Sequence, residues 1–413
     1  MIRMPLLAIF LNALFFSCNP NLDGPEVLTV EPKTDDKTTT IEVPKELLSS
    51  LKFDYNMHTN NPEFVKLETI DQSRIGRIDK LIAAKSSYVI ADKYLANSVF
   101  FFDKNGKFLK RVNPVDGQAS PLVLGSVTYD SKRRLIYVHF HNNDESYLHS
   151  YTEAGEFVGK HNLNGLYFTE FSILSDSSFA FFLPGDKAKS IINDYQLAFG
   201  NRDGKTQSVA FSFSSSNALS NFGYNYNLVS FDDYLLFSKN YSKYVFQAST
   251  QPTKIYPRFE LTGGNSDSLL VEIDSTSSVS EIRTLLDRKF QFSGRVLPTT
   301  NHFYFEFTKK GERIGFFYSN QNGHIVGGRP EARLAVGDSL KIDYYSYPVT
   351  SFEDKFISVL DPNEIASSEK AFDLIRQSSN FHGPLRTKKL DSLLRALKAN
   401  ENPVLMIYQL RPF

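Results

Sequence analysis

The chain has 413 residues, with 46 basic and 46 acidic side chains, so its formal net charge is zero. This balance argues against nucleic acid as a partner, and 41% hydrophobic residues exclude a wholly disordered chain. A single cysteine excludes an intrachain disulfide and a cysteine-based metal cluster.

The first segment in chain order is a short apolar run that ends at this cysteine. Arg3 precedes residues 5–16, which are apolar except for Asn12, and Ser17 stands directly before Cys18. Such a run is too short to span a bilayer and is typical of a secretory signal. A small residue before the cysteine resembles the bacterial lipobox, so we expect residues 1–17 to be removed and Cys18 to carry a lipid that anchors the chain to a membrane.

Two interpretations of this start remain open. The alternative to a lipoprotein signal is an ordinary cleaved signal that leaves a free thiol, which is unfavourable in an oxidising compartment. Phe15 departs from the lipobox, where leucine is usual. Residues 18–40, rich in Pro, Asp, Thr and Lys, predict a flexible tether. The expected location is the outer membrane, on its periplasmic or its surface side.

Paired strand signals follow the predicted tether. Three turns contain a glycine at equal spacing, 49 residues apart: Gly106, Gly155 and Gly204. A period near fifty residues is typical of a β-propeller, whose blades are four-stranded sheets. We expect each turn to be a type I turn followed by a glycine with positive φ. The aromatic residues two positions later, Phe108 and Phe157, are expected to pack between blades.

Two stretches have the periodicity of helices rather than strands. They are residues 262–292, with a capping box at 278–281, and residues 363–400. Without them, residues 64–413 divide into six units of about 47 residues, whereas seven units would have about 40. The sequence therefore predicts six blades with two helical insertions, the sixth blade beginning at Leu340.

The last unit lacks an outer strand after the apolar strand at residues 403–410. A ring left open there would expose unpaired strand edges. We therefore expect residues 64–69 to pair with this strand and close the ring. The predicted fold is an all-β, six-bladed propeller over residues 41–413.

Residues 64–112 closely resemble the opening of the six-bladed β-propeller lipoproteins that are common in Bacteroidota. The shared features are a strand ending in Leu-Glu-Thr, an Ile-Gly-x-Ile strand and a Phe-Asp-x-Asn-Gly-Lys-Phe hairpin, and residues 402–408 resemble the family's end. Residues 117–122 depart from the family's Gly-x-Gly-Pro-x-Glu-Tyr loop, so no role of that loop transfers to this chain. The resemblance implies a fold and a location, and no activity.

One strand carries two candidate metal ligands. His139 and His141 lie on the same face of a predicted strand, with Asp144 and His149 nearby in the sequence. Two imidazoles and a carboxylate suit a divalent metal ion. We favour the alternative, a solvated strand end that leads into a polar turn, because motifs this short arise by chance.

Several tyrosines are candidates for ligand binding. Tyr224, Tyr226, Tyr344 and Tyr345, together with Tyr347, have side chains that suit stacking on sugar rings. The alternative is packing between blades, since aromatic side chains usually fill cores.

The sequence contains none of the motifs of serine hydrolases, kinases or zinc proteases. The leading hypothesis is a lipid-anchored, non-enzymatic binding or scaffold module for a protein or glycan partner, with no cofactor expected. The alternative is a metal-dependent hydrolase or lactonase, similar to six-bladed lactonases that hold a metal ion in the central channel. Its candidate ligands are Glu68, Asp79, Asp92, Asn227 and Glu306.

Overall fold

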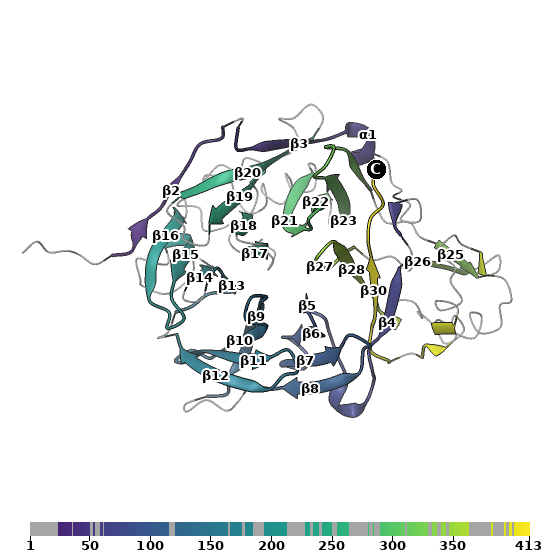
Figure 1. Cartoon of the computed structure of the whole chain (residues 1–413), viewed down its shortest axis with the longest axis horizontal. Coiled ribbons are helices and arrows are strands. Elements are labelled where there is room, and N and C mark those ends of the chain that lie inside the picture. Colours follow the sequence, from purple (N-terminus) through teal and green to yellow (C-terminus); the bar gives the residue numbers. More distant parts are fainter. Residues whose placement is uncertain are drawn as a thin grey trace, which may run out of the picture.

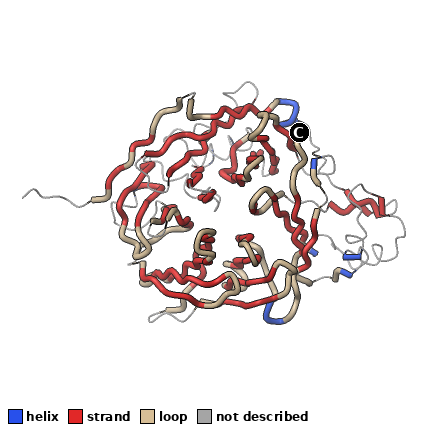
Figure 2. Tube along the Cα trace, viewed as in Figure 1, coloured by secondary structure: helices blue, strands red, loops and turns tan. Residues whose placement is uncertain are grey.

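Six sheets stand in a ring around a common axis in the computed structural model (Figure 1). The described residues are almost entirely strand, turn and loop, as Figure 2 shows, and this confirms the predicted all-β propeller. The structure describes residues 24–34, 36–49, 53, 58–60, 62–114, 120–163, 166–175, 178–184, 194–212, 228–231, 234–238, 242–249, 254–263, 280, 284, 290–309, 312–328, 333–336, 340–343, 347–362, 381–382, 392–393, 396–398 and 400–413.

Each blade contains four antiparallel strands, ordered from the axis outward. Blades 1 to 3 consist of β5 (Lys80–Ala83), β6 (Ser87–Asp92), β7 (Ser98–Asp103) and β8 (Phe108–Val112); β9 (Val123–Asp130), β10 (Leu135–His141), β11 (Ser146–Thr152) and β12 (Phe157–Asn162); and β13 (Glu170–Ile173), β14 (Phe179–Phe182), β15 (Tyr195–Gly200) and β16 (Thr206–Ser212).

Blades 4 to 6 follow the same plan. They consist of β17 (Leu228–Phe231), β18 (Tyr234–Ser238), β19 (Tyr244–Ser249) and β20 (Lys254–Gly263); β21 (Gln291–Pro298), β22 (His302–Lys309), β23 (Glu312–Ser319) and β24 (Ile325–Gly328); and β27 (Thr350–Phe352), β28 (Lys355–Leu360), β30 (Val404–Tyr408) and β4 (Glu63–Lys66).

The core lies between neighbouring blades, so both faces of a blade are buried. On β7, Phe101 packs in the cluster between blades 1 and 2, whereas Phe100 and Phe102 pack in the cluster between blades 6 and 1. All three side chains are fully buried. Strands buried on both faces have continuous apolar runs instead of alternating ones, which explains the Phe-rich segments of the sequence.

The glycine turns have the predicted conformation. Gly106 and Gly155 have a φ of 84° and Gly204 has a φ of 75°. A side chain at Gly106 would also clash, since an added Cβ would lie 2.1 Å from a backbone oxygen of β4. Phe108 packs between blades as expected, but Phe157 is 57% exposed. Its ring lies against its own sheet, edge-on to Tyr151 with ring centroids 5.7 Å apart.

The ring closes where the predicted strands meet. β4 runs antiparallel to β30, with Phe64 opposite Met406. Asn402, just before β30, fastens the joint, because its amide nitrogen donates to the backbone oxygens of Glu68 and Ser73, each at 2.7 Å. The buried side chain of Asn402 thus ties the two distant segments together.

The predicted tether is partly wrong, because residues 26–34 and 36–43 form a strap along the outside of the ring (Figure 1). β1 (Glu26–Val27) runs parallel to β16, and β2 (Thr29–Val30) and β3 (Thr39–Val43) run parallel to β20. Ile41 and Val43 are buried in the cluster between blades 4 and 5. The alternation of polar and apolar residues in β3 favours a strand, although the composition of residues 18–40 suggested a linker.

Charge also fastens the strap. The carboxylate of Glu260 on β20 forms two ion pairs. Its oxygens lie 2.6 Å from the Nζ atom of Lys33 in the strap and 2.8 Å from the Nζ atom of Lys243 in blade 4. Burial alone would raise the pKa of Glu260, but the two ammonium groups outweigh it and lower this pKa to about 2. Glu260 therefore stays ionised, and its charge is neutralised within the fold.

The two predicted helical insertions fall largely outside the described residues. In the first, Ser280 and Thr284 are helical, and the Thr284 hydroxyl donates to the Ser280 backbone oxygen at 2.9 Å. In the second, β29 (Phe381–His382) is a strand that pairs with β25 (Arg333–Val336).

The start predicted for blade 6 is wrong. β26 (Leu340–Asp343) pairs with β25 in a small sheet that also holds β29 and lies outside the ring (Figure 1). Blade 6 begins instead at β27, which forms a hairpin with β28. The described helices include α1 (Lys45–Ser49) and the 3₁₀ turn η1 (Asp71–Ser73). None of the helices in the described part of the chain has the length and apolar character needed to cross a bilayer.

Candidate binding pocket between blades 4 and 5

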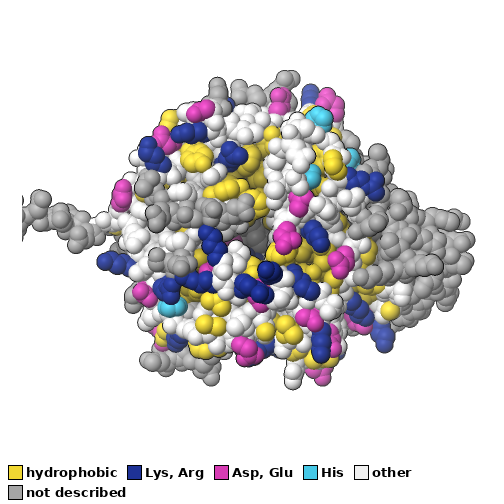
Figure 3. Space-filling model, in the orientation of Figure 1, with side chains coloured by type: hydrophobic (Ala, Val, Ile, Leu, Met, Phe, Trp, Pro, Cys, Tyr) yellow, Lys and Arg dark blue, Asp and Glu magenta, His cyan; other side chains and the backbone are white. Residues whose placement is uncertain are grey.

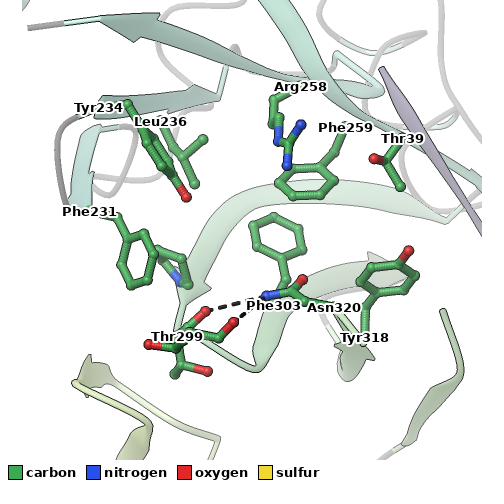
Figure 4. Close-up of a pocket in the computed structure, with 12 residues that line it drawn as sticks. Thr39, Phe231, Tyr234, Leu236, Arg258, Phe259, Thr299, Phe303, Tyr318 and Asn320 are labelled. Atoms are coloured by element: carbon green, nitrogen blue, oxygen red, sulfur yellow. Dashed lines mark hydrogen bonds between the residues drawn. The ribbon is translucent and has the colours of Figure 1, made fainter. Parts of the chain in front are cut away.

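A pocket with a volume of about 280 Å³ lies between blades 4 and 5 (Figure 4). It forms where the inner hairpins β17–β18 and β21–β22 meet, and the outer strand β20 and the strap complete it. In the space-filling view, hydrophobic side chains reach the surface on this part of the ring (Figure 3). The lining residues are Thr39, Phe231, Tyr234, Leu236, Arg258, Phe259, Pro298, Thr299, Thr300, Phe303, Tyr318 and Asn320.

Aromatic rings form the walls of the pocket. Phe231, the last residue of β17, pairs with Tyr234, the first residue of β18, and their rings lie 5.7 Å apart. On the opposite side, Phe259 stacks on Phe303 with centroids 4.3 Å apart and planes 22° apart. Phe259 and Phe303 are buried, whereas Phe231 and Tyr234 are only partly covered. The wall formed by Phe259 and Phe303 is therefore fixed by packing, whereas the rings of Phe231 and Tyr234 are partly open to a ligand.

Polar groups form the rim. The Asn320 amide donates to the backbone oxygens of Thr299 and Thr300, at 3.3 and 3.2 Å, which holds the turn after β21 (Figure 4). Burial raises the pKa of Tyr318, and the positive charge of the nearby Arg258 offsets only part of this increase. The Tyr318 hydroxyl therefore stays protonated at neutral pH and can donate a hydrogen bond.

Arg258 reaches the pocket because of a β-bulge. Phe246 of β19 pairs with Pro257 and Val245 pairs with Phe259, so Arg258 has no partner on β19. A bulge of this kind re-aims the side chain of the extra residue. The same bulge recurs in blades 1 to 3, where the extra residues are Leu109, Val158 and Gln207. Successive bulge residues are 49, 49 and 51 residues apart, the last spacing being that from Gln207 to Arg258.

None of the residues that line this pocket was predicted from the sequence to bind a ligand. The predicted tyrosines, Tyr224, Tyr226, Tyr344 and Tyr345, lie outside the described residues, so their role as ligand-binding residues stays a prediction. Tyr347 is described and serves packing, because its hydroxyl donates to the backbone oxygen of Arg313, whose guanidinium lies over the Tyr347 ring at 4.5 Å.

The predicted histidine pair comes together in the structure. His139 and His141 stack with ring centroids 4.9 Å apart, and His139 also stacks on Phe168 at 4.1 Å. The Nε2 atom of His139 lies 3.0 Å from the Ser146 hydroxyl oxygen. Burial, helped by His141 and Lys93, holds the pKa of His139 well below its usual range, so this ring is neutral.

The described residues do not supply the carboxylate that a metal site at this histidine pair would need. Within this part of the chain, no group of three or more His, Cys, Asp or Glu side chains is arranged to hold a metal ion. The stacked rings instead pack at the junction between blades 2 and 3. A metal ion at His139 and His141 remains a prediction without structural support.

The carboxylates considered for a channel metal are engaged in separate places. Asp92 accepts four backbone N–H groups from the loops that follow η1 and β6. Glu306 binds Arg313, and Glu68 accepts the backbone N–H of Phe108 at 2.9 Å. Asp79 is paired with Arg77 at 2.8 Å. Asn227 lies outside the described residues.

A channel contact that the sequence did not predict links three blades. Lys80 at the start of β5 donates to the Glu170 carboxylate at 3.0 Å, and the other oxygen of that carboxylate accepts the backbone N–H of Leu228 at 3.2 Å. Glu170 thus joins blades 1, 3 and 4. Around the central hollow, Figure 3 shows mainly Lys and Arg side chains, with some Asp and Glu side chains beside them.

Comparison with known proteins gives one family match and several structural likenesses. A family described as a domain of unknown function, DUF4934, matches residues 38–409. The comparison with curated proteins gives no match. A crystal structure from Bacteroides fragilis NCTC 9343, described as a candidate exported protein, superposes with a TM-score of 0.66 at 14% identity, covering 91% of this chain and 100% of that one.

Two further structures are more distant. The β-propeller domain of Cps50 (Swd1) from Myceliophthora thermophila gives a TM-score of 0.36 at 8% identity, over 65% of this chain and 89% of that one. A nidogen/laminin complex gives 0.25 at 10% identity, over 42% and 59%. Both scores are too low to support an argument about this chain.

Proposed function

The chain belongs to the DUF4934 family, and we propose that it is a binding module of the cell envelope that holds a glycan chain in the pocket between blades 4 and 5. The observation that carries the proposal is the pocket itself. It combines partly exposed aromatic rings with a polar rim, and it stands on strand ends whose positions are set by the packed blades. Such a site binds a ligand without chemical change.

The size and walls of the pocket favour a sugar ring. Its 280 Å³ lies just below the ~300–1,000 Å³ of pockets for drug-sized molecules, so it suits one ring-sized group rather than a folded partner. The C–H face of a sugar packs on aromatic rings such as Tyr234 and Phe231, while its hydroxyls need donors and acceptors such as those of Asn320 and Thr300. A protein partner would need a broader apolar surface.

An envelope location is part of the proposal. The apolar run up to residue 17 and the lipobox-like Ser17–Cys18 pair support export and a lipid on Cys18. The B. fragilis protein that shares the fold is itself described as a candidate exported protein. The first described residues of the chain lie at the rim of blade 3, where β1 pairs with β16 (Figure 1). A lipid on Cys18 would therefore hold that rim close to a membrane.

The test of the function is glycan binding by the full chain in detergent. Retention on a panel of immobilised polysaccharides, followed by calorimetry with the oligosaccharides that are retained, should reveal at least one ligand. Tyr234→Ala removes one wall and should weaken that affinity about tenfold, the effect expected for loss of a stacking contact. Tyr94→Ala, which removes an exposed tyrosine of the loop after β6, is the control and should change nothing. Equal affinities for the Tyr234 variant and the native chain would refute the site.

The anchor has its own test. In cells, Cys18→Ala removes the proposed lipid attachment site and should move the protein from the membrane fraction to the soluble fraction, with an unchanged thermal unfolding midpoint. Cys18 lies outside the described residues, and none of the contacts between blades given above involves it. Continued sedimentation of the variant with membranes would count against a lipid on Cys18.

A further inference from the structure

We propose that the outer rim of blades 1 and 2 rests on the surface of a lipid bilayer, through an apolar patch formed by Leu109, Phe157 and Val158. This rim patch is not part of the pocket. Its role rests on the proposed lipid on Cys18 and adds to that anchor a defined orientation of the ring. The inference starts from the exposure of the three side chains, which is between 41% and 57%.

The three side chains lie on two neighbouring outer strands. Leu109 belongs to β8 of blade 1, whereas Phe157 and Val158 begin β12 of blade 2. Their neighbours in the sequence, Lys110 and Glu156, form an ion pair between the two blades at 3.0 Å. This ion pair brings the two parts of the patch next to each other, and Figure 1 shows β8 and β12 along the same stretch of the outer edge of the ring.

The rim patch distinguishes blades 1 and 2 from blades 3 and 4. Leu109 and Val158 are the extra residues of the bulges in their outer strands, where blades 3 and 4 have the polar residues Gln207 and Arg258. All four side chains are exposed. Because two blades place a polar side chain at this position, the fold does not require an apolar one there. Exposed apolar side chains that gather on one surface mark an interaction site.

The proposed anchor reaches the ring at the level of this patch. β1 runs parallel to β16, and Glu26 pairs with the residue after Gln207, so the chain arrives from the end of β16 that holds this bulge. Gln207 corresponds to Val158 of the neighbouring blade. Five residues separate Cys18 from Gly24, the first described residue, and even a fully extended chain spans at most ~22 Å over this distance. A bilayer that holds a lipid on Cys18 is therefore close to this rim.

A bilayer fits the rim patch better than a protein partner does. Three side chains provide far less than the ~800 Å² that each partner buries in a typical protein interface. Insertion of a few apolar side chains among lipid headgroups instead gains free energy in proportion to the apolar area that is buried. Lys110 and Lys160 lie on the same two strands, and long lysine side chains can extend their ammonium groups to lipid phosphates.

The experiment measures contact between the rim patch and lipids, with the lipidated full chain in vesicles of phosphatidylethanolamine and phosphatidylglycerol. The thiol of Cys18 carries the lipid, so Leu109→Cys or Phe157→Cys introduces the one free thiol, which takes a polarity-sensitive fluorophore. Both labels should shift to shorter emission wavelengths in vesicles and lose most of their intensity when spin-labelled lipids are included. The control is Tyr94→Cys, at an exposed residue of the loop after β6, whose label should not respond.

A second variant separates contact through the patch from nearness to the anchor. A label on Lys160→Cys, which lies on β12 beside the patch, should also be quenched by spin-labelled lipids. Adding Leu109→Ser, Phe157→Ser and Val158→Ser should abolish this quenching, whereas the protein should still sediment with vesicles through its lipid. The thermal unfolding midpoint should change little, because the three side chains are exposed.

The outcomes separate this inference from the anchor on which it rests. If the labels at Leu109 and Phe157 respond like the label at Tyr94, the bilayer contact is refuted while the anchor stands. A shift to shorter wavelengths without quenching by spin-labelled lipids would also refute it, because a second copy or another protein would then cover the patch. If the native chain does not sediment with vesicles, the lipid on Cys18 fails together with this inference.

Discussion

Two junctions between blades are built from equivalent strands but differ in packing. The junction between blades 2 and 3 is filled by side chains, whereas the junction between blades 4 and 5 opens into a pocket. The third residue of the second strand differs between them. In blade 2 it is Tyr137, whose ring meets Phe179 of blade 3 edge-on at 5.9 Å. In blade 4 it is Leu236, which lines the pocket beside Phe303 of blade 5.

The strand pairings show that these positions correspond. In blade 2, Leu135 pairs with the last residue of β9, and Tyr137 follows it two residues later. In blade 4, Tyr234 pairs with the last residue of β17, and Leu236 follows it two residues later. Phe179 and Phe303 hold equivalent places opposite the ends of β13 and β21. Leucine is smaller than tyrosine and lacks its ring, so this difference leaves part of the space between blades 4 and 5 unfilled and contributes to the pocket.

The largest expected effect is on the filled junction. Phe179 is fully buried, and Phe179→Ala should lower the free energy of unfolding by about 3–5 kcal/mol, through lost burial and the cavity that remains. Urea unfolding followed by circular dichroism measures this. Phe157→Ala, which removes a ring that is 57% exposed, is the control and should cost far less. Equal costs for the two variants would contradict the description of this junction as packed.

The next effect concerns the open junction. Leu236→Tyr copies the residue of blade 2 and should place a ring in the pocket, which lowers glycan affinity at least tenfold. The added ring costs about 1–3 kcal/mol of stability if it crowds its neighbours, and less if the space accepts it. Calorimetry and urea unfolding measure the two effects. Leu236→Met preserves volume and should preserve binding. A Leu236→Tyr variant that still binds with native affinity would show that the ligand site lies elsewhere.

Much of the fold was predictable, because it depends on residues close together in the sequence or on simple pairing needs. The positive φ of Gly106, Gly155 and Gly204 follows from turn chemistry at a fixed period. The pairing of β4 with β30 follows from the cost of an open edge. These features confirm the predicted blade count and ring closure.

The pocket was not predictable in the same way. Its lining comes from segments of the strap, blade 4 and blade 5 that no local pattern connects. The small size of Leu236 matters only once β18 is placed opposite β22, and the aim of Arg258 depends on a bulge in the pairing of β19 with β20. The strap was missed for a related reason, since β3 gains its stability from Phe259–Gly263, which lie far along the chain.

The smallest expected effect is a dependence on pH that separates the two junctions. Burial keeps the pKa of His139 well below its usual range in the folded state, whereas in the unfolded chain it is about 6.5. As the pH falls below ~6.5, His139 takes up a proton in the unfolded chain but not yet in the folded one, which favours unfolding. The stability that the neutral His139 contributes is therefore complete above pH ~6.5 and is lost as the pH falls towards the folded-state pKa. Urea midpoints measured from pH 8 to pH 4.5 should fall accordingly.

His139→Phe removes the titrating group and keeps a ring on Phe168, so the decrease of the urea midpoint below pH ~6.5 should become shallower. His324→Gln, a change at an exposed turn of blade 5, is the control. Glycan affinity measured over pH 7.5 to 5.5 should stay constant, because none of the described residues that line the pocket is a histidine. An affinity that follows the stability curve would mean that the two junctions are coupled, and that the pocket depends on more than its own two blades.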